Sequence, residues 1–434
     1  MVKKFFKSSL LTLLFVTALL GFVACSSSDT ETATANTTSA TESASGKTTT
    51  EEPSFPVRTE DPTFNGICFA MTGAYSRKLN MDKLMDLIEI MNVHSMRNWM
   101  HATTILSKDM TIKETAVNRQ KEWIKKLNDH GVTKIIGMSH YWFWPEKYNV
   151  TDKSAAPYRD KSEGSKFNEW ITLYEETWYT LASIFPEIGY WEIGNEFNMD
   201  IFLHPEDYYS TGIKFTLDEK AELVTEMCFA ASSGIHRANP EAIVIFPGMA
   251  PEGGFTIMRK FLRRVYENIA SGEFGNGSTD PDDYFGAVAW HCYVLNERFN
   301  IDNWVDYNNS VYEIMEIYGD ADKKVFLTEY GFSDDGDEKT DTKQAEYLEQ
   351  IYDAVYNRML YVDSIYPFRL VEDNTKLGID DIEVYYGMFR VFDQESFGAK
   401  EKAKAVCKTY GGNLSSLDKY IGNNSVYPTN INNK

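Results

Sequence analysis

Two glutamates stand near the ends of two apolar, β-rich stretches of the sequence. Residues 189–197 read Gly-Tyr-Trp-Glu-Ile-Gly-Asn-Glu-Phe and reach Asn195 and Glu196, and residues 324–332 read Lys-Val-Phe-Leu-Thr-Glu-Tyr-Gly-Phe and reach Glu329. Each stretch has the composition of a buried strand. Two carboxyl groups that face one site suit cleavage of a glycosidic bond, in which one acid protonates the leaving oxygen and the other attacks the anomeric carbon. The pattern therefore predicts one active site that two strand ends share.

The elements that must position these glutamates form a repeating α/β pattern from residue 64 to about residue 410, with no linker-like break. We expect strands at residues 64–71, 93–99, 133–139, 189–197, 242–246, 284–290, 324–332 and 362–370. Each is followed by an amphipathic helix pattern, for example at residues 113–130, 217–239 and 303–318, and a helix capped by residues 341–344 follows the seventh strand. Eight such units predict a (β/α)8 TIM barrel. An open doubly wound sheet is the rival, but no Gly-x-Gly-x-x-Gly motif or P-loop follows the first strand.

Polar and aromatic side chains gather at the predicted C-terminal ends of these strands, where a barrel interior would call for Val, Ile and Leu. The set consists of Arg97, His140, Asn195, Glu196, His291, Tyr293, Glu329 and Phe368. In TIM barrels, functional residues lie at this end, so the set predicts an active site.

The order of these residues resembles glycoside hydrolase clan A, most closely family 5, which includes the cellulases, and also the related family 39. In family 5 an Arg after strand two, a His after strand three, Asn-Glu after strand four, His-x-Tyr after strand six and Glu after strand seven line the −1 sugar subsite. The matching residues here are Arg97, His140, Asn195-Glu196, His291-Cys292-Tyr293 and Glu329. The sequence departs from that pattern in two places: Phe197 stands where a proline is common, and the usual strand-eight tryptophan is missing, with Phe368 or Arg369 nearest its place.

The resemblance implies a retaining mechanism in which Glu196 is the acid/base and Glu329 the nucleophile. It also implies that Asn195 binds the sugar 2-hydroxyl and that Tyr293 and Arg97 hold Glu329 as a carboxylate. His140 and His291 would then bind substrate hydroxyls or orient their neighbours.

An aromatic run, Tyr-Trp-Phe-Trp at residues 141–144, follows the third predicted strand on the same side of the barrel. Flat rings suit the apolar faces of sugars, so we expect Trp142 or Trp144 to contact substrate. Packing in the hydrophobic core is the open alternative for both rings.

The composition favours a neutral partner and no cofactor. The formal net charge is −21, which argues against nucleic acid and against anionic polymers. No Cys-x-x-Cys pair and no His-Glu-x-x-His motif occurs, so no metal site is expected. The acidic runs at residues 280–283 and 334–338 do not match an EF-hand, and we interpret them as solvated loops. A monomer that binds carbohydrate is the simplest expectation.

The N-terminus has the pattern of a bacterial lipoprotein. Three lysines, Lys3, Lys4 and Lys7, precede an apolar run at residues 10–23, which predicts a signal peptide over residues 1–24. The sequence Phe-Val-Ala-Cys ending at Cys25 resembles a lipobox, so Cys25 is the expected lipidation site, with plain secretion as the alternative. Residues 25–57 are rich in Ser and Thr and predict a disordered linker.

The expected organisation is therefore a lipid-anchored barrel over residues 58–412, followed by a flexible tail at residues 413–434, on the bacterial cell surface. Three functions remain open: an endo-β-glycanase such as a cellulase or mannanase, an exo-acting β-glycosidase such as a β-xylosidase, and a glycan-binding lipoprotein without activity. The sequence does not choose between glucan, mannan and xylan.

Overall fold

A closed ring of parallel strands forms the centre of the protein. The computed structural model describes residues 61–70, 78–251, 254–293, 299–334, 338–374 and 381–421. Its main sheet has eight strands in the order β1-β2-β3-β5-β7-β8-β9-β10, all pairs being parallel. These are β1 (Gly66–Phe69), β2 (Ser95–Trp99), β3 (Lys134–Met138), β5 (Tyr190–Glu192), β7 (Ile243–Ile245), β8 (Ala287–His291), β9 (Lys324–Tyr330) and β10 (Val362–Pro367). Parallel bridges Asn65 to Ile365 and Cys68 to Phe368 close the ring between its first and last strands.

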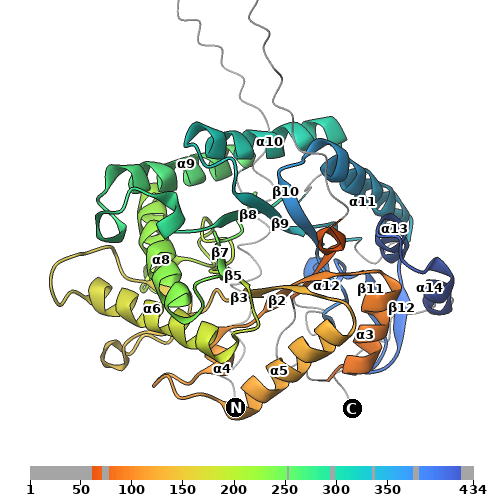
Figure 1. The fold of residues 1–434 in the computed structure, drawn as a ribbon, viewed down its shortest axis with the longest axis horizontal. Coiled ribbons are helices and arrows are strands. Elements are labelled where there is room, and N and C mark those ends of the chain that lie inside the picture. The colour runs from red at the N-terminus through yellow and green to blue at the C-terminus, as the bar shows by residue number, and fades with distance from the viewer. Residues whose placement is uncertain are drawn as a thin grey trace, which may run out of the picture. The chain divides into compact units, whose positions relative to one another are not determined.

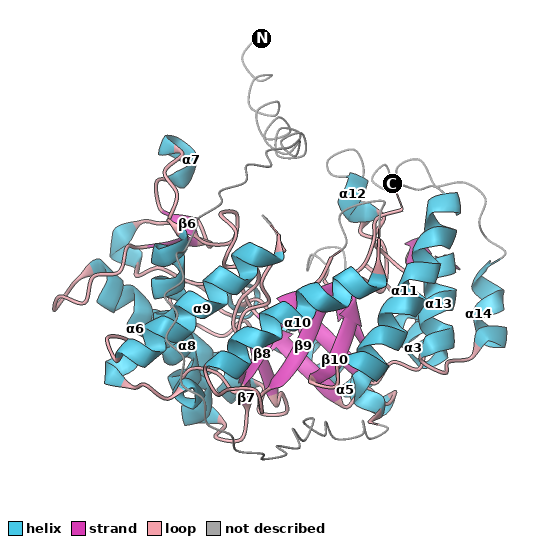
Figure 2. Ribbon diagram, turned by 90° about the horizontal axis from the view of Figure 1, so that it is seen from above, coloured by secondary structure: helices cyan, strands magenta, loops and turns pink. Residues whose placement is uncertain are grey.

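A helix follows each strand and lies outside the ring (Figures 1 and 2). These helices are α3 (Met81–Ile90), α5 (Glu114–Asp129), α6 (Lys166–Ile184), α8 (Leu217–Ala238), α9 (Phe255–Ser271), α10 (Ile301–Ile317), α11 (Glu338–Arg358) and α13 (Glu401–Thr409). The predicted (β/α)8 barrel is confirmed. The helices form where the apolar spacing and the caps agree: α8 begins with a reciprocal capping box between Thr216 and Glu219.

Shorter elements complete the described chain. They are α4 (Ala102–Ile105), α7 (Tyr208–Thr211), α12 (Asp381–Val384), α14 (Leu414–Ile421), β4 (Ala155–Ala156), β6 (His204–Pro205), β11 (Phe389–Val391), β12 (Phe397–Ala399) and 3-10 turns at Pro62–Phe64, Glu146–Tyr148, Gly275–Gly277 and Pro281–Asp283.

Two apolar clusters hold the barrel together. The larger lies between the strands and the helices and includes Trp123, Trp178 and Trp191. The smaller cluster fills the ring with residues such as Ile136, Ile245, Ala287, Ala289 and Phe326.

Two local predictions near the C-terminal part are wrong. Helix α11 begins at Glu338, before Asp341, and the Asp341 carboxylate instead accepts hydrogen bonds from the backbone N–H groups of Glu401 and Lys402 at the start of α13. Asp334 begins the run at residues 334–338 that we interpret as solvated, but it is fully buried and lies 2.7 Å from Lys400 Nζ, while residues 335–337 lie outside the described part of the chain. Sequence spacing identifies a side chain that can cap or pair, but not the partner that the fold brings to it.

The tail prediction is also wrong in part. Residues 413–434 were expected to be flexible, but α14 lies against α3 and β12, with Leu417 buried. The rest of that tail, the signal peptide, Cys25 and the linker lie outside the described residues. Within the described part of the chain, none of the helices has the length and apolar character needed to cross a membrane.

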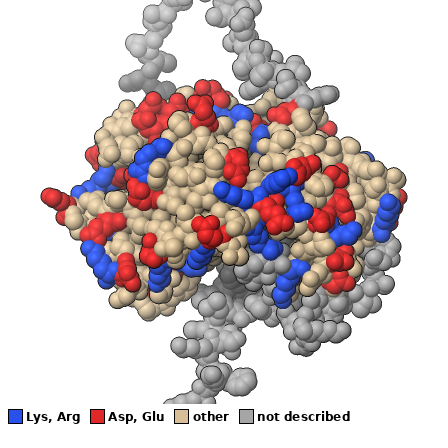
Figure 3. All heavy atoms as spheres, turned by 60° about the horizontal axis from the view of Figure 1, so that its bottom comes forward, with Lys and Arg blue, Asp and Glu red and all other residues tan. Residues whose placement is uncertain are grey.

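Charged side chains of both signs intermingle on the face shown in Figure 3. Exposed ion pairs also occur among the described residues, such as that of Lys125 with Asp129 one helical turn away. Pairs of this kind contribute little to stability because water and salt screen them.

Candidate active site

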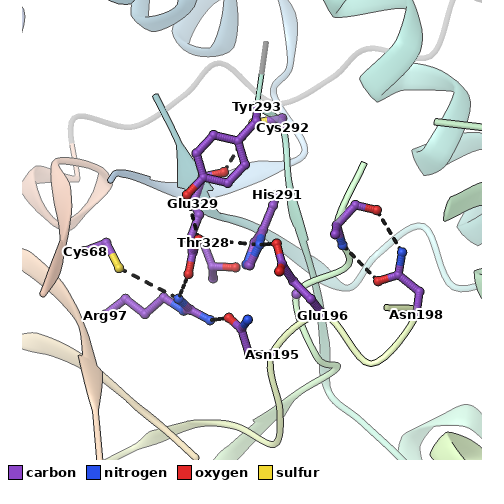
Figure 4. Close-up of polar contacts among 12 residues, drawn as sticks. Cys68, Arg97, Asn195, Glu196, Asn198, His291, Cys292, Tyr293, Thr328 and Glu329 are labelled. Carbon is purple, nitrogen blue, oxygen red and sulfur yellow. Dashed lines mark hydrogen bonds and ion pairs between the residues drawn. The ribbon is translucent and has the colours of Figure 1, made fainter. Parts of the chain in front are cut away.

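The two predicted catalytic carboxyl groups and one imidazole meet at the C-terminal end of the ring. One ligand atom from each of Glu196, His291 and Glu329 lies within 4.8 Å of the others. His291 Nδ1 lies 2.7 Å from Glu196 Oε1 and 3.6 Å from Glu329 Oε2, so the imidazole bridges the two acids (Figure 4). Three distant segments of the sequence therefore supply one site: β8, β9 and the loop after β5.

The backbone around Glu196 is unusual. The strand predicted over residues 189–197 is shorter in the structure, Tyr190–Glu192, although Asn195 still forms an isolated parallel bridge with Gly248. Glu196 has φ of +51°, in the left-handed region. That conformation costs a non-glycine residue about 1–3 kcal/mol, and tertiary contacts must hold it. One such contact is the hydrogen bond from the Glu196 N–H to the carbonyl of Gly248, at 2.7 Å.

Gly248 brings its backbone into the centre of the site. A Cβ at this position would lie 2.5 Å from His291 Nε2 and 2.8 Å from both Glu192 Oε1 and Thr328 Oγ1. Its N–H also donates to Glu192 Oε1 at 3.0 Å. Only glycine fits here, and the sequence reasoning missed it, although a Pro-Gly pair directly after a strand pattern is a visible signal.

Arg97 links three side chains beneath the catalytic pair. Its Nε donates to Glu192 Oε2 at 2.5 Å, its Nη2 donates to Asn195 Oδ1 at 2.8 Å, and its Nη1 donates to Glu329 Oε1. Arg97 and Glu192 are fully buried. Because the Asn195 oxygen accepts from Arg97, its NH2 group remains available to donate to a ligand. Glu192 was not predicted as a site residue. The feature that could have identified it is a single acidic residue within an aromatic strand.

The surroundings set the two carboxyl groups apart in pKa. Burial raises the pKa of Glu196, and the hydrogen bond with His291 does not offset it. Burial acts in the same direction on Glu329, but His291, the Arg97 charge and the Tyr293 hydroxyl, which donates at 2.7 Å, outweigh it and lower the pKa of Glu329. Burial would lower the pKa of His291, but Glu329 and Glu196 raise it overall.

Aromatic rings line the site beyond Glu329. Phe368, which follows β10 and is 5% exposed, has its ring centroid 6.1 Å from that of Tyr293 and 5.6 Å from that of Tyr386. Tyr386 also contacts Tyr293, at 5.5 Å. Phe368 therefore lies where it was expected, and Tyr386 is a neighbour that the sequence analysis did not identify.

The structure contradicts the expected contact of Trp142 and Trp144 with sugar. The two side chains are 2% and 5% exposed, and both indole N–H groups donate to the carbonyl of Ala155, at 2.7 and 2.9 Å. Both rings pack against Trp170 in the larger apolar cluster. The core-packing alternative is correct, because the loop turns these rings inward. Tyr141, half-buried, is the member of the run whose ring meets that of His140.

Glu196, His291 and Glu329 also form the one group in the described part of the chain whose ligand atoms are close enough to share a metal ion. The guanidinium of Arg97 already lies against Glu329. A second cation at that carboxylate would meet a like charge, so the donor set fits proton transfer better than metal binding.

Comparisons with known proteins agree with this arrangement. Residues 53–360 match the family Cellulase (glycosyl hydrolase family 5). A search of curated proteins finds no match. Three solved structures share the fold at low sequence identity.

A family 39 glycoside hydrolase from Bacteroides cellulosilyticus WH2 has a TM-score of 0.54 at 17% identity, covering 82% of this chain, while the chain spans 64% of the length of that structure. The family 1 β-glucosidase from Thermotoga maritima has a TM-score of 0.56 at 14% identity, and the match covers 78% of this chain and 87% of that structure. A GH5-4 broad specificity endoglucanase from Clostridium acetobutylicum has a TM-score of 0.55 at 13% identity, and the match covers 80% of this chain and 96% of that structure. The chain therefore belongs to glycosyl hydrolase family 5 and is a glycosidase with the barrel of clan A.

Proposed function

We propose that the protein is a retaining β-glycosidase that hydrolyses a neutral poly- or oligosaccharide by double displacement. The observation that carries this proposal is the separation of the two acids, whose nearest ligand atoms lie within 4.8 Å of each other. Retaining enzymes hold their carboxyl groups about 5–5.5 Å apart, whereas inverting enzymes leave about 6.5–9.5 Å for a water molecule.

In the first step, the Glu329 carboxylate attacks the anomeric carbon while Glu196 donates its proton to the departing oxygen. A covalent bond forms between Glu329 and the sugar, and the glycosidic bond breaks. In the second step, Glu196 takes a proton from water, which attacks the same carbon and releases Glu329. Two inversions return the original β configuration.

The neighbouring groups support these roles. The hydrogen bond from Tyr293 and the charge of Arg97 keep Glu329 ionised and oriented for attack. Because the pKa of Glu196 is raised, its carboxyl group stays protonated and can donate that proton to the leaving oxygen. The free NH2 group of Asn195 is placed to hydrogen-bond a sugar hydroxyl, a contact that strengthens as charge develops at the anomeric carbon.

The family match and the formal net charge of −21 support the proposed substrate class. A family whose description is cellulase, and a similar fold in a broad specificity endoglucanase, favour an endo-acting enzyme on a neutral β-glycan. An exo-acting β-glycosidase is the second candidate, because a β-glucosidase shares the fold. A glycan-binding protein without activity is the third, and the complete pair of acids argues against it.

The test is the stereochemistry of hydrolysis. The protein is incubated with aryl β-glucoside, β-mannoside and β-xyloside and with the corresponding polysaccharides, and the first product of any substrate that is cleaved is followed by proton NMR. The β anomer is expected first. The α anomer first would replace the retaining mechanism by an inverting one. Binding of these glycans without any cleavage, under conditions where the protein is folded, would leave only the binding role.

A further inference from the structure

A second group of polar side chains lies beside the catalytic pair, at the ends of β2 and β3, and the mechanism above does not use most of it. Trp99 ends β2, His101 follows two residues later, and His140 follows β3. Their rings form one cluster: the centroids of His101 and His140 are 4.4 Å apart, and those of Trp99 lie 5.2 Å and 5.6 Å from them. Strand β3 lies between β2 and β5 in the ring, and Glu196 follows β5, so the cluster lies at the same end of the barrel as Glu196.

Four polar atoms of this cluster are buried and lack hydrogen-bond partners among the described residues. They are Nε1 of Trp99, Nδ1 of His101 and both ring nitrogens of His140. Buried polar atoms in proteins are nearly always hydrogen-bonded, since each unpaired one costs stability. Four unpaired atoms in one cluster at the catalytic face therefore point to a ligand that pairs them.

The chemistry of these atoms indicates the kind of ligand. Burial lowers the pKa of His101 to about 3, with Lys153 and Arg97 adding to the effect, and burial also holds the pKa of His140 well below its usual value. Both imidazoles are therefore neutral near pH 7, and each offers one donor and one acceptor. A hydroxyl group also both donates and accepts. The indole of Trp99 adds a donor and a flat apolar face, which suits the face of a sugar ring.

We propose that Trp99 and His101, together with His140, form a sugar-binding subsite that selects neutral sugars by hydrogen bonds to ring hydroxyls. The inference rests on the proposed function, because it assigns the substrate class and the specificity residues of the same site. Trp99 and His101 are the new members. Their nitrogen atoms, rather than their bulk alone, bind the substrate.

The experiment separates the nitrogen atoms from the rings. Trp99→Phe and His101→Phe each keep an aromatic ring and remove the polar atom. Binding is measured by calorimetry in the Glu329→Gln background, which stops turnover, with cellotriose, mannotriose and xylotriose. The tightest binder is then replaced by its monodeoxy derivatives and by a trisaccharide that carries glucuronic acid.

Each substitution is expected to weaken binding of the neutral trisaccharide about tenfold. One monodeoxy derivative lacks the hydroxyl that the side chain binds. For that derivative, the same substitution should not weaken binding any further. His94→Phe is the matched control. His94 lies just before β2, and its ring nitrogens already pair with the Gly131 carbonyl and Asn92 Oδ1, both at 2.9 Å, so its substitution should leave binding unchanged.

The inference is overturned if both variants bind the neutral trisaccharide as tightly as the parent, or if each substitution weakens the binding of every derivative by the same factor. It is also overturned if the trisaccharide that carries glucuronic acid binds more tightly than the neutral one. Hydrolysis by the unsubstituted protein judges the proposed function separately. If the unsubstituted protein hydrolyses the glycan but the His101→Phe variant binds it normally, the proposed function stands and the subsite is rejected. If the unsubstituted protein hydrolyses nothing, but each substitution weakens binding except for the derivative that lacks the bound hydroxyl, the subsite stands and the proposed function is rejected.

Discussion

The roles of Glu196 and Glu329 differ because their contacts differ. Glu329 receives a hydrogen bond from Tyr293 and lies against Arg97, and both contacts favour the carboxylate. Glu196 has His291 as its polar side-chain neighbour among the described residues, and burial dominates. The sequence order suggested this assignment, and the observed contacts give it a physical cause.

The Tyr293 hydroxyl gives a prediction about pH. Tyr293→Phe removes a donor that stabilises the Glu329 carboxylate, so the pKa of Glu329 should rise from its lowered value. Activity falls at low pH when Glu329 is protonated, so the acidic limb of the profile should move to higher pH. The alkaline limb, which reports loss of the Glu196 proton, should move less. The measurement is kcat/KM against pH.

Tyr312→Phe is the control for that experiment. Tyr312 lies on α10, and its hydroxyl donates to the backbone carbonyl of Ala321, away from the catalytic pair. Its variant should keep the parent profile. An acidic limb that stays in place or moves to lower pH in Tyr293→Phe would contradict the account of Glu329.

At the scale of elements, the loop after β7 is as important to the site as the strands. Gly248, in that loop, accepts from the Glu196 N–H and donates to Glu192, and a side chain there would overlap three polar neighbours. Gly248→Ala should therefore displace Glu196 or His291 and lower kcat/KM by roughly 100-fold, since a misplacement of about 1 Å can have that effect.

Gly189→Ala provides the matched control. Gly189 directly precedes β5, and a Cβ there would meet no atom within 4 Å, so activity and melting temperature should stay close to those of the parent. If Gly248→Ala were folded and as active as Gly189→Ala, the close approach at Gly248 would not matter to the site.

The sequence predicted the strands and helices well because periodic apolar patterns decide them locally. Glu329 and His291 could be placed because each lies at or next to the end of a strand, and the strand ends of a barrel meet. Trp142 and Trp144 could not, since an irregular loop has no period that tells which rings turn inward. Glu192 was missed because its partner, Arg97, is nearly a hundred residues away and only the closed ring brings them together.

The C-terminal segment shows the same limit. Lys400 and Lys402 are fully buried and lie 2.7 and 2.9 Å from Asp334, which follows β9. Lys400 is the residue just before α13, and Lys402 lies in the first turn of that helix. A buried lysine is tolerated only with a partner, and no local pattern identifies a partner that lies 66 residues away.

At the scale of the whole molecule, we propose that the barrel works outside the cell, held at a membrane by lipid on Cys25. The proposal rests on the lysines, the apolar run and the lipobox-like sequence at the N-terminus. Cys25→Ser in the full chain, expressed in a bacterium with lipoprotein processing, should move most of the protein from the membrane fraction to the medium or the soluble fraction. Ser26→Ala is the control that should stay with the membrane. Equal membrane association of both variants would contradict the lipid anchor.

Double displacement requires Glu329 to form a covalent bond with the sugar. The direct test uses a 2-deoxy-2-fluoro β-glycoside of the preferred sugar with a good leaving group, because fluorine slows the second step and lets the glycosyl-enzyme accumulate. Mass spectrometry of the intact protein should show the added mass of one fluorosugar, and peptide mapping should place it on Glu329. A label on Glu196, or complete turnover by an inverting enzyme with no label at all, would contradict the account.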